Sequence, residues 1–230
     1  CDDIKEISLE LIGKKVSLNV YAGAVTYNNK YDLADDVITK MVQALEYSKK
    51  DTNPNLCFYS EKVSKQFRRY NLIKEKLKES IANNFQGFNL VYQPFMSHDG
   101  KKIIGCETLL RWKTEELKDV TPDEFIPILE ESDDIIKVGR FVMEEAVKQQ
   151  KEWHNKFGYG YVSFNVSYQQ FLVDDYAKDV IETIKKYDVD PSCIIIELTE
   201  STKVKKTELL ADVFNELRES GIGIALDDFG

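Results

Sequence analysis

The chain has 230 residues, of which 43% are hydrophobic and 31% charged, and its net charge is −9. This composition is sufficient for an apolar core and excludes a largely disordered chain. The net negative charge argues against binding to nucleic-acid polymers or anionic membranes, because both depend on fields of lysine and arginine. Apolar runs are short, such as Cys193–Ile196, so no segment approaches the roughly 20 residues of a membrane span.

Charge is distributed unevenly along the chain. Residues 1–83 carry 14 basic and 12 acidic side chains, whereas residues 84–230 carry 17 and 28. Two regions of different charge predict two domains. The two histidines, His98 and His154, and the four cysteines, which form no C-x-x-C pair, do not indicate a zinc site. Unpaired thiols favour a reduced, cytoplasmic location for this fragment, and tethering of a parent protein to the inner face of the membrane stays open.

The first region contains few predicted elements. Residues 16–27 are apolar and β-prone and predict a strand, and residues 56–59 predict a short second strand. Between them, apolar residues at helical spacing predict a helix over 32–50. A polar amphipathic helix over about 61–83 then leads into the second region.

The second region begins with a predicted hairpin and continues with alternating strands and helices. Strands over 88–95 and 102–112 flank a turn that contains Asp99-Gly100. A Thr-Pro-x-Glu capping box at Thr121 predicts the start of a helix. Further predicted strands cover 161–166, 194–198 and 223–226, and further helices cover about 135–156, 175–186 and 205–220. This order predicts an α/β fold with a parallel sheet or barrel.

Side chains that can ligate a hard cation stand where the predicted strands end. They are Asn165, Glu200, Asp227 and Asp228, and catalytic groups of β/α proteins cluster at such ends. On the return strand of the hairpin, period-two alternation places Glu107, Leu109 and Arg111 on one face. The opposite face, with Ile104, Cys106, Thr108, Leu110 and Trp112, is expected to pack under helices.

Each of these polar residues alone has a structural explanation, as a helix cap, a turn residue or a surface charge. Together they indicate a metal site. Oxygen ligands without histidine or cysteine select Mg²⁺, Mn²⁺ or Ca²⁺, and the adjacent aspartates favour two ions that clamp a phosphodiester. The sequence has no P-loop motif and no G-x-S-x-G motif, so neither phosphate-loop nor serine-hydrolase chemistry is indicated.

Several motifs in this region resemble the EAL domain family. They are Tyr92-Gln93-Pro94, Glu107–Trp112 (ETLLRW), Pro122–Pro127 (PDEFIP), Asn165-Val166-Ser167 with Gln170-Phe171, Glu197–Ser201 (ELTES) and Gly221–Gly230 (GIGIALDDFG). The resemblance covers about residues 66–230. It implies a TIM-like (β/α)8 barrel with an antiparallel first strand, incomplete in this chain. It also implies hydrolysis of the bacterial second messenger cyclic di-GMP to linear pGpG with two Mg²⁺ or Mn²⁺ ions.

The resemblance also implies roles for individual residues. Metal ligands would be Glu107, Asn165, Glu200 and Asp227, with Asp228 on the second ion; of these, Glu107, Asp227 and Asp228 would be catalytic. Gln93 and Arg111 would contact the dinucleotide. Thr108 replaces the alanine of the family signature, and because it is expected on the packing face, no loss of activity is expected from it.

Residues 1–60 more weakly resemble the C-terminal half of a GGDEF (diguanylate cyclase) domain, whose signature loop would precede Cys1. The resulting division is a GGDEF-like part over 1–60, a linking helix over 61–83 and an EAL part over 84–230. Upstream sensor domains and a homodimer through the EAL domain are further partners that the resemblance implies, besides cyclic di-GMP itself.

In the EAL family, a lysine and a general-base glutamate follow the double aspartate, together with the closing strands. We therefore expect a polypeptide ending at Gly230 to be inactive and poorly soluble, whereas the complete domain is folded and active. Two alternatives to the enzyme are a catalytically silent cyclic di-GMP receptor or regulatory module, and a scaffold that acts only through protein contacts. The intact metal-site residues favour the enzyme.

Overall fold

A computed structural model describes residues 7–11, 14–18, 20–27, 33–50, 55–158, 160–199 and 207–227. The chain divides into two compact units, Cys1–Ile73 and Lys74–Gly230, with the boundary inside helix α2 (Glu61–Ala82). In the described ranges, no helix combines the length and the apolar character needed to cross a membrane.

The first unit contains two small two-stranded sheets. Strands β1 (Ile7–Leu11) and β2 (Lys14–Leu18) form an antiparallel hairpin. Strands β3 (Ala22–Ala24) and β4 (Leu56–Phe58) pair in parallel and are connected through helix α1 (Ala34–Ser48). The single strand predicted over 16–27 is therefore wrong, because β2 and β3 have different pairing partners. At Gly23, the β3 backbone approaches α1 so closely that an added Cβ would clash with Met41 O.

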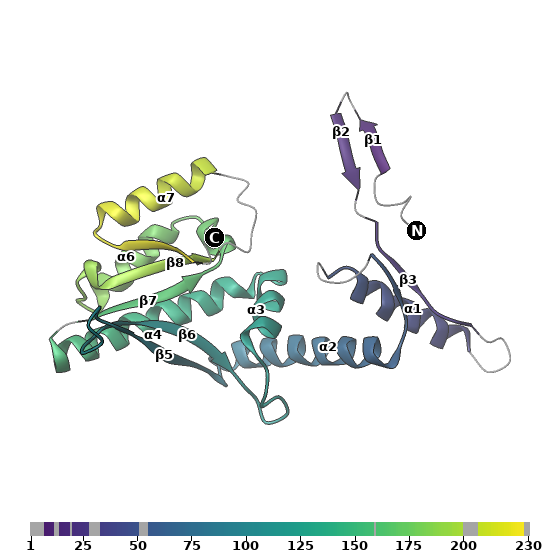
Figure 1. Cartoon of the computed structure of the whole chain (residues 1–230), viewed down its shortest axis with the longest axis horizontal. Coiled ribbons are helices and arrows are strands. Elements are labelled where there is room, and N and C mark those ends of the chain that lie inside the picture. Colours follow the sequence, from purple (N-terminus) through teal and green to yellow (C-terminus); the bar gives the residue numbers. More distant parts are fainter. Residues whose placement is uncertain are drawn as a thin grey trace. The chain divides into compact units, whose positions relative to one another are not determined.

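The second unit is built on one five-stranded sheet in the order β5-β6-β7-β8-β9 (Figure 1). Strands β5 (Phe88–Met96) and β6 (Ile103–Trp112) are antiparallel, which confirms the hairpin. Strands β7 (Tyr161–Val166), β8 (Ile194–Thr199) and β9 (Gly223–Asp227) follow in parallel. The α/β fold is confirmed, with five strands of the predicted barrel among the described residues.

Helices connect the parallel strands. They are α3 (Pro122–Glu131), α4 (Asp134–Phe157), α5 (Tyr168–Phe171), α6 (Tyr176–Lys186) and α7 (Thr207–Glu219), with a 3-10 turn at Pro191–Cys193 before β8. The capping box at the start of α3 is confirmed, with Pro122 in the first turn and Thr121 N donating to Glu124 Oε2 at 3.3 Å. The local sequence predicts the start of α3 and the bounds of α4, α6 and α7 to within a few residues, whereas the short α5 and the 3-10 turn were not predicted.

The core of this unit lies between the helices and one face of the sheet. That face carries buried apolar side chains of β7 and β8, namely Val162, Phe164, Val166, Ile194, Ile196 and Leu198. Helix α4 contacts β5 and β7, and α7 contacts β9. Trp112 Nε1 donates to Ser80 Oγ at 3.0 Å and ties the end of β6 to α2. Because apolar burial uses one face, the polar residues of the strands lie on the other.

Candidate functional site

The strand registers bring the polar residues onto one face of the sheet. Gln93 on β5 lies opposite Glu107 on β6, which in turn pairs with Ser163 on β7. On β7 and β8, Asn165 pairs with Glu197. Paired residues of neighbouring strands point to the same face, so residues distant in sequence form one surface. We call these five residues, together with Arg111, the site face.

The central contact of the site face joins β6 and β7. Asn165 Nδ2 donates a hydrogen bond to Glu107 Oε1 at 2.8 Å. The other amide atom, Asn165 Oδ1, is buried and has no hydrogen-bond partner among the described residues. An unpaired buried oxygen costs about 1–3 kcal/mol. The arrangement thus leaves an oxygen of Asn165, beside a carboxylate, available for a cation. Asn165 does not cap helix α5, whose N-cap is Ser167.

On β5, Gln93 lies opposite Glu107, and Arg111 lies further along β6. Gln93 is exposed and Arg111 half-buried, with Arg111 Nη1 donating to Leu110 O at 2.9 Å. Arg111 is four residues beyond Glu107 on the same face, roughly 13 Å along an extended strand. This separation places the guanidinium away from the Glu107–Asn165 contact, at a distance suited to another part of a large ligand.

The remaining predicted ligands are described only in part. Asp227 is the last residue of β9 and pairs with Thr199 at the end of β8, and its side chain is not described. Glu200 and Asp228 lie outside the described residues. Among the side chains that are described, no group of three or more His, Cys, Asp or Glu comes together. The structure therefore brings together Glu107 and Asn165, and Glu200, Asp227 and Asp228 stay predictions as ligands.

Glu197 is a carboxylate on the site face that was not predicted as a metal ligand or a substrate-binding residue. It is half-buried and lies in register with Asn165. The signal was present in the sequence, since the alternating apolar residues Ile194, Ile196 and Leu198 direct the residue between the last two to the opposite face. The prediction instead placed the ligand of this strand at Glu200.

The opposite face of the hairpin packs as predicted, with one exception. Thr108 is 2% exposed, and burial raises the pKa of the Cys106 thiol to about 11. Tyr92 lies edge-on to Trp153 at 4.8 Å between ring centroids, and burial raises its pKa to about 12. Ile104, which was expected to be buried, is 40% exposed because it lies near the start of β6.

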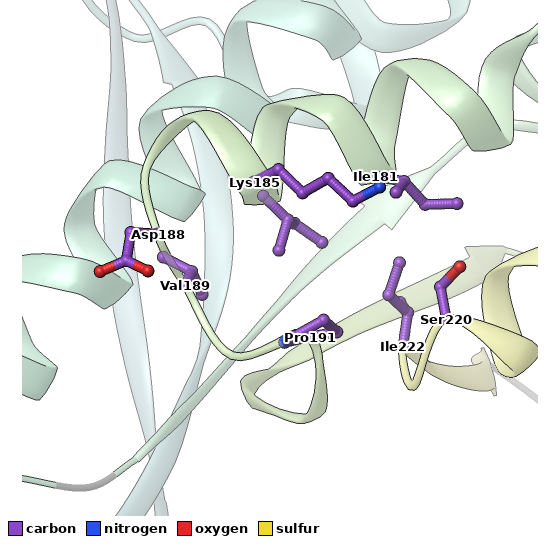
Figure 2. Close-up of a pocket in the computed structure, with 8 residues that line it drawn as sticks. Ile181, Lys185, Asp188, Val189, Pro191, Ser220 and Ile222 are labelled. Atoms are coloured by element: carbon purple, nitrogen blue, oxygen red, sulfur yellow. The ribbon is translucent and has the colours of Figure 1, made fainter.

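A cavity of about 350 Å³ lies apart from the site face (Figure 2). It is bounded by the end of α6 and by the segments that precede β8 and β9, with Ile181, Ile184, Lys185, Asp188, Val189, Pro191, Ser220 and Ile222 as its lining. It is therefore at the amino ends of these strands, whereas Asn165 and Asp227 are at carboxyl ends. None of the candidate residues lines it.

The residues that the structure brings together fit a hard divalent cation. Glu107 on β6 and Glu197 on β8 supply carboxylates on the two strands that flank β7, and Asn165 on β7 supplies an unpaired amide oxygen. Mg²⁺ and Mn²⁺ prefer such oxygen ligands. The site face can therefore hold a metal and, through Gln93 and Arg111, a polar or anionic ligand.

Comparison with known proteins agrees with this chemistry. The EAL domain model matches residues 74–230. Signaling protein YkoW of Bacillus subtilis is 37% identical over 67% of this chain and 19% of its own length. MucR of Pseudomonas aeruginosa, a bifunctional diguanylate cyclase/cyclic di-GMP phosphodiesterase, is 24% identical over 99% of this chain and 33% of its own length.

A solved structure extends the comparison to three dimensions. It is that of the MucR phosphodiesterase in complex with cyclic di-GMP, which matches with a TM-score of 0.64 and 28% identity over 69% of this chain and 64% of that one. The chain spans only about a fifth to a third of the length of the two curated relatives.

Proposed function

Because the chain belongs to the EAL domain family, we propose that the complete protein hydrolyses cyclic di-GMP to linear pGpG and that this chain supplies metal ligands and substrate-binding residues of its site. The observation that carries the proposal is the contact of Glu107 with Asn165, whose second amide atom stays unpaired. The relative MucR, whose name includes cyclic di-GMP phosphodiesterase, supports the substrate.

In this proposal, Glu107, Asn165, Glu200 and Asp227 hold one divalent ion, and Asp228 serves a second. Glu197, in register with Asn165, is a further carboxylate at the same edge. Two Mg²⁺ or Mn²⁺ ions, when bound, polarise the phosphodiester and stabilise the charge of its attacking and leaving oxygens.

The residues of the chain itself bind and orient the dinucleotide. Arg111 presents a planar guanidinium whose parallel N–H groups match two oxygens of one phosphate. Gln93 lies opposite Glu107 and is exposed, so its amide can contact a ligand that sits over the metal ligands. Binding and metal coordination are thus assigned to different residues of one face.

The alternative function is a cyclic di-GMP receptor without turnover. Such a receptor would need Gln93 and Arg111 but not a metal-ligand contact. The Glu107–Asn165 hydrogen bond and the unpaired Asn165 Oδ1 favour the enzyme.

For the first unit, we infer a GGDEF-like part over residues 1–60. The parallel pair β3–β4 with α1 as its crossover supports an α/β domain, and the match to the bifunctional relative MucR extends over 99% of this chain. Dimerisation through the EAL domain and sensor domains upstream stay predictions.

The test is cleavage of cyclic di-GMP by Glu107→Ala and Asp227→Ala variants of the complete protein, with pGpG measured by chromatography in Mg²⁺ and in EDTA. Both variants should lose cleavage while keeping the circular dichroism of the wild type. Glu115→Ala, an exposed glutamate in the loop after β6, is the matched control and should keep full activity. Metal-dependent turnover by the Glu107→Ala variant would contradict the proposal. Ca²⁺ should not replace Mg²⁺, because its ligand shell is longer and looser.

A further inference from the structure

Ser163 is a fully buried polar residue on the site face. Its exposed fraction is 0%, and its Oγ has no hydrogen-bond partner within the described part of the chain. It lies two residues before Asn165 on β7 and in register with Glu107 on β6. Buried hydroxyls in folded proteins are almost always hydrogen-bonded, to protein or to ordered water, so a partner for Ser163 is expected within this face.

The registers limit what that partner can be. The residues in register with Ser163 on its two neighbouring strands are Glu107 and Ile195. Ile195 has no polar side-chain atom. Glu107 Oε1 already accepts from Asn165, but an ionised carboxylate has about four acceptor positions. Of the residues in register, Glu107 is thus the one that offers an acceptor to the Ser163 hydroxyl, whereas Asn165 Oδ1, further along the same strand, is the oxygen assigned above to the cation.

We propose that Ser163 is a positioning residue for Glu107: its hydroxyl donates to one internal water, which in turn donates to the carboxylate. This water would bridge the Ser163 hydroxyl, which has no partner among the described residues, and the Glu107 carboxylate, which has acceptor positions left beside the one that Asn165 uses. With Asn165 on one side and Ser163 on the other, both oxygens of Glu107 are oriented before a metal binds. The effect of Ser163 on metal binding rests on the proposed function, in which Glu107 is a metal ligand. Carboxylates that ligate metals are commonly held by such outer hydrogen bonds.

Thr108 on β6 offers a matched control on the other face of the sheet. It follows Glu107 directly, is 2% exposed, and its Oγ1 also lacks a partner among the described residues. Its side chain lies on the packing face, away from the metal ligands. Removing this hydroxyl with Thr108→Val therefore matches Ser163→Ala in chemistry but not in position.

The first experiment needs no metal. Urea unfolding midpoints are measured for Ser163→Ala, Glu107→Met and the double variant in EDTA. The proposal expects Ser163→Ala to lower the midpoint in the wild-type background and to have little further effect in the Glu107→Met background. Additive shifts, or a raised midpoint in the Ser163→Ala single variant, would overturn it. Thr108→Val should combine additively with Glu107→Met.

The second experiment measures Mn²⁺ affinity by calorimetry. Ser163→Ala should bind Mn²⁺ roughly 10–100-fold more weakly, the usual effect of losing an outer hydrogen bond to a ligand, whereas Thr108→Val should bind like the wild type. Unchanged affinity in Ser163→Ala would overturn the positioning role. A wild type that binds no Mn²⁺ would instead overturn the proposed function, and the metal-free experiment would still decide whether Ser163 acts on Glu107.

Discussion

At the scale of single residues, Asn165 shows why an amide stands where a carboxylate might be expected. Its nitrogen donates to Glu107 Oε1, and its oxygen remains unpaired. An aspartate in its place would set two negative groups against each other at hydrogen-bond distance, which raises the pKa of one of them. The amide therefore orients a neighbouring ligand without adding charge.

Arg111 allows binding to be separated from metal coordination. Arg111→Ala should weaken the binding of cyclic di-GMP by about 1.5–3 kcal/mol, the range for hydrogen bonds to charged groups. Mn²⁺ affinity should be unchanged, because Arg111 lies four residues beyond Glu107 on β6. Calorimetric titrations of both ligands test this. Arg140→Ala is the control, since Arg140 is an exposed residue of α4 paired with Asp179 at 2.7 Å. The reverse pattern would show that Arg111 is structural.

Tyr92 predicts a loss of stability in alkali. Burial raises its pKa from 10.0 to about 12, so the neutral phenol is favoured in the folded state. A raised folded-state pKa contributes stability below pH 10 that is lost as the pH rises to about 12. Tyr92→Phe keeps the ring contact with Trp153 and removes the titration. Urea unfolding at pH 8 and pH 11 should show a smaller pH effect in this variant, and an equal effect would contradict the assignment.

At the scale of elements, the contact between α4 and α5 supports the end of β7. The α4 backbone at Gly139 touches the side chain of Gln170, so closely that an added Cβ would overlap it. Gln170 is 5% exposed and has little room to move. Because α5 begins two residues after β7 ends, this contact helps to fix the segment that follows Asn165.

Gly139→Ala should therefore destabilise the protein by about 1–3 kcal/mol, the usual cost of overpacking. In a helix without this contact, the same change would stabilise the protein by about 0.5–1 kcal/mol. The sign of the change in unfolding free energy therefore shows whether the contact between Gly139 and Gln170 is tight. Gln170→Ala in the Gly139→Ala background should recover part of the loss, and a lack of recovery would mean that the clash lies elsewhere.

At the scale of the whole molecule, the two units should respond differently to metal. All predicted ligands lie within Lys74–Gly230, and a ligand stabilises the cooperative unit that binds it. Mn²⁺ at 100 times its Kd should add about 2.7 kcal/mol to the stability of that unit. Hydrogen exchange should show added protection in residues 74–230, reversed by EDTA, and none in residues 1–73. Equal protection of both units would contradict a single site in the second.

Local sequence patterns were sufficient to predict most elements of the second unit and the faces of its hairpin. The capping box at Thr121, the turn at Asp99-Gly100 and the alternation around Glu107 are local patterns, and local physics is sufficient to form them. The motifs also predicted Glu107, Asn165, Gln93 and Arg111 as members of one site, and the pairing of the strands places all four on one face.

The pairing and register of strands that lie far apart along the chain are visible only in the three-dimensional structure. It divided the segment 16–27 between two sheets, placed Asn165 in contact with Glu107, and put Glu197 and Ser163 on the site face. The physical reason is that a strand's alternation repeats every two residues, whereas its pairing partner and register depend on residues far along the chain. Alternation shows which side chains share a face, and pairing decides which of them meet.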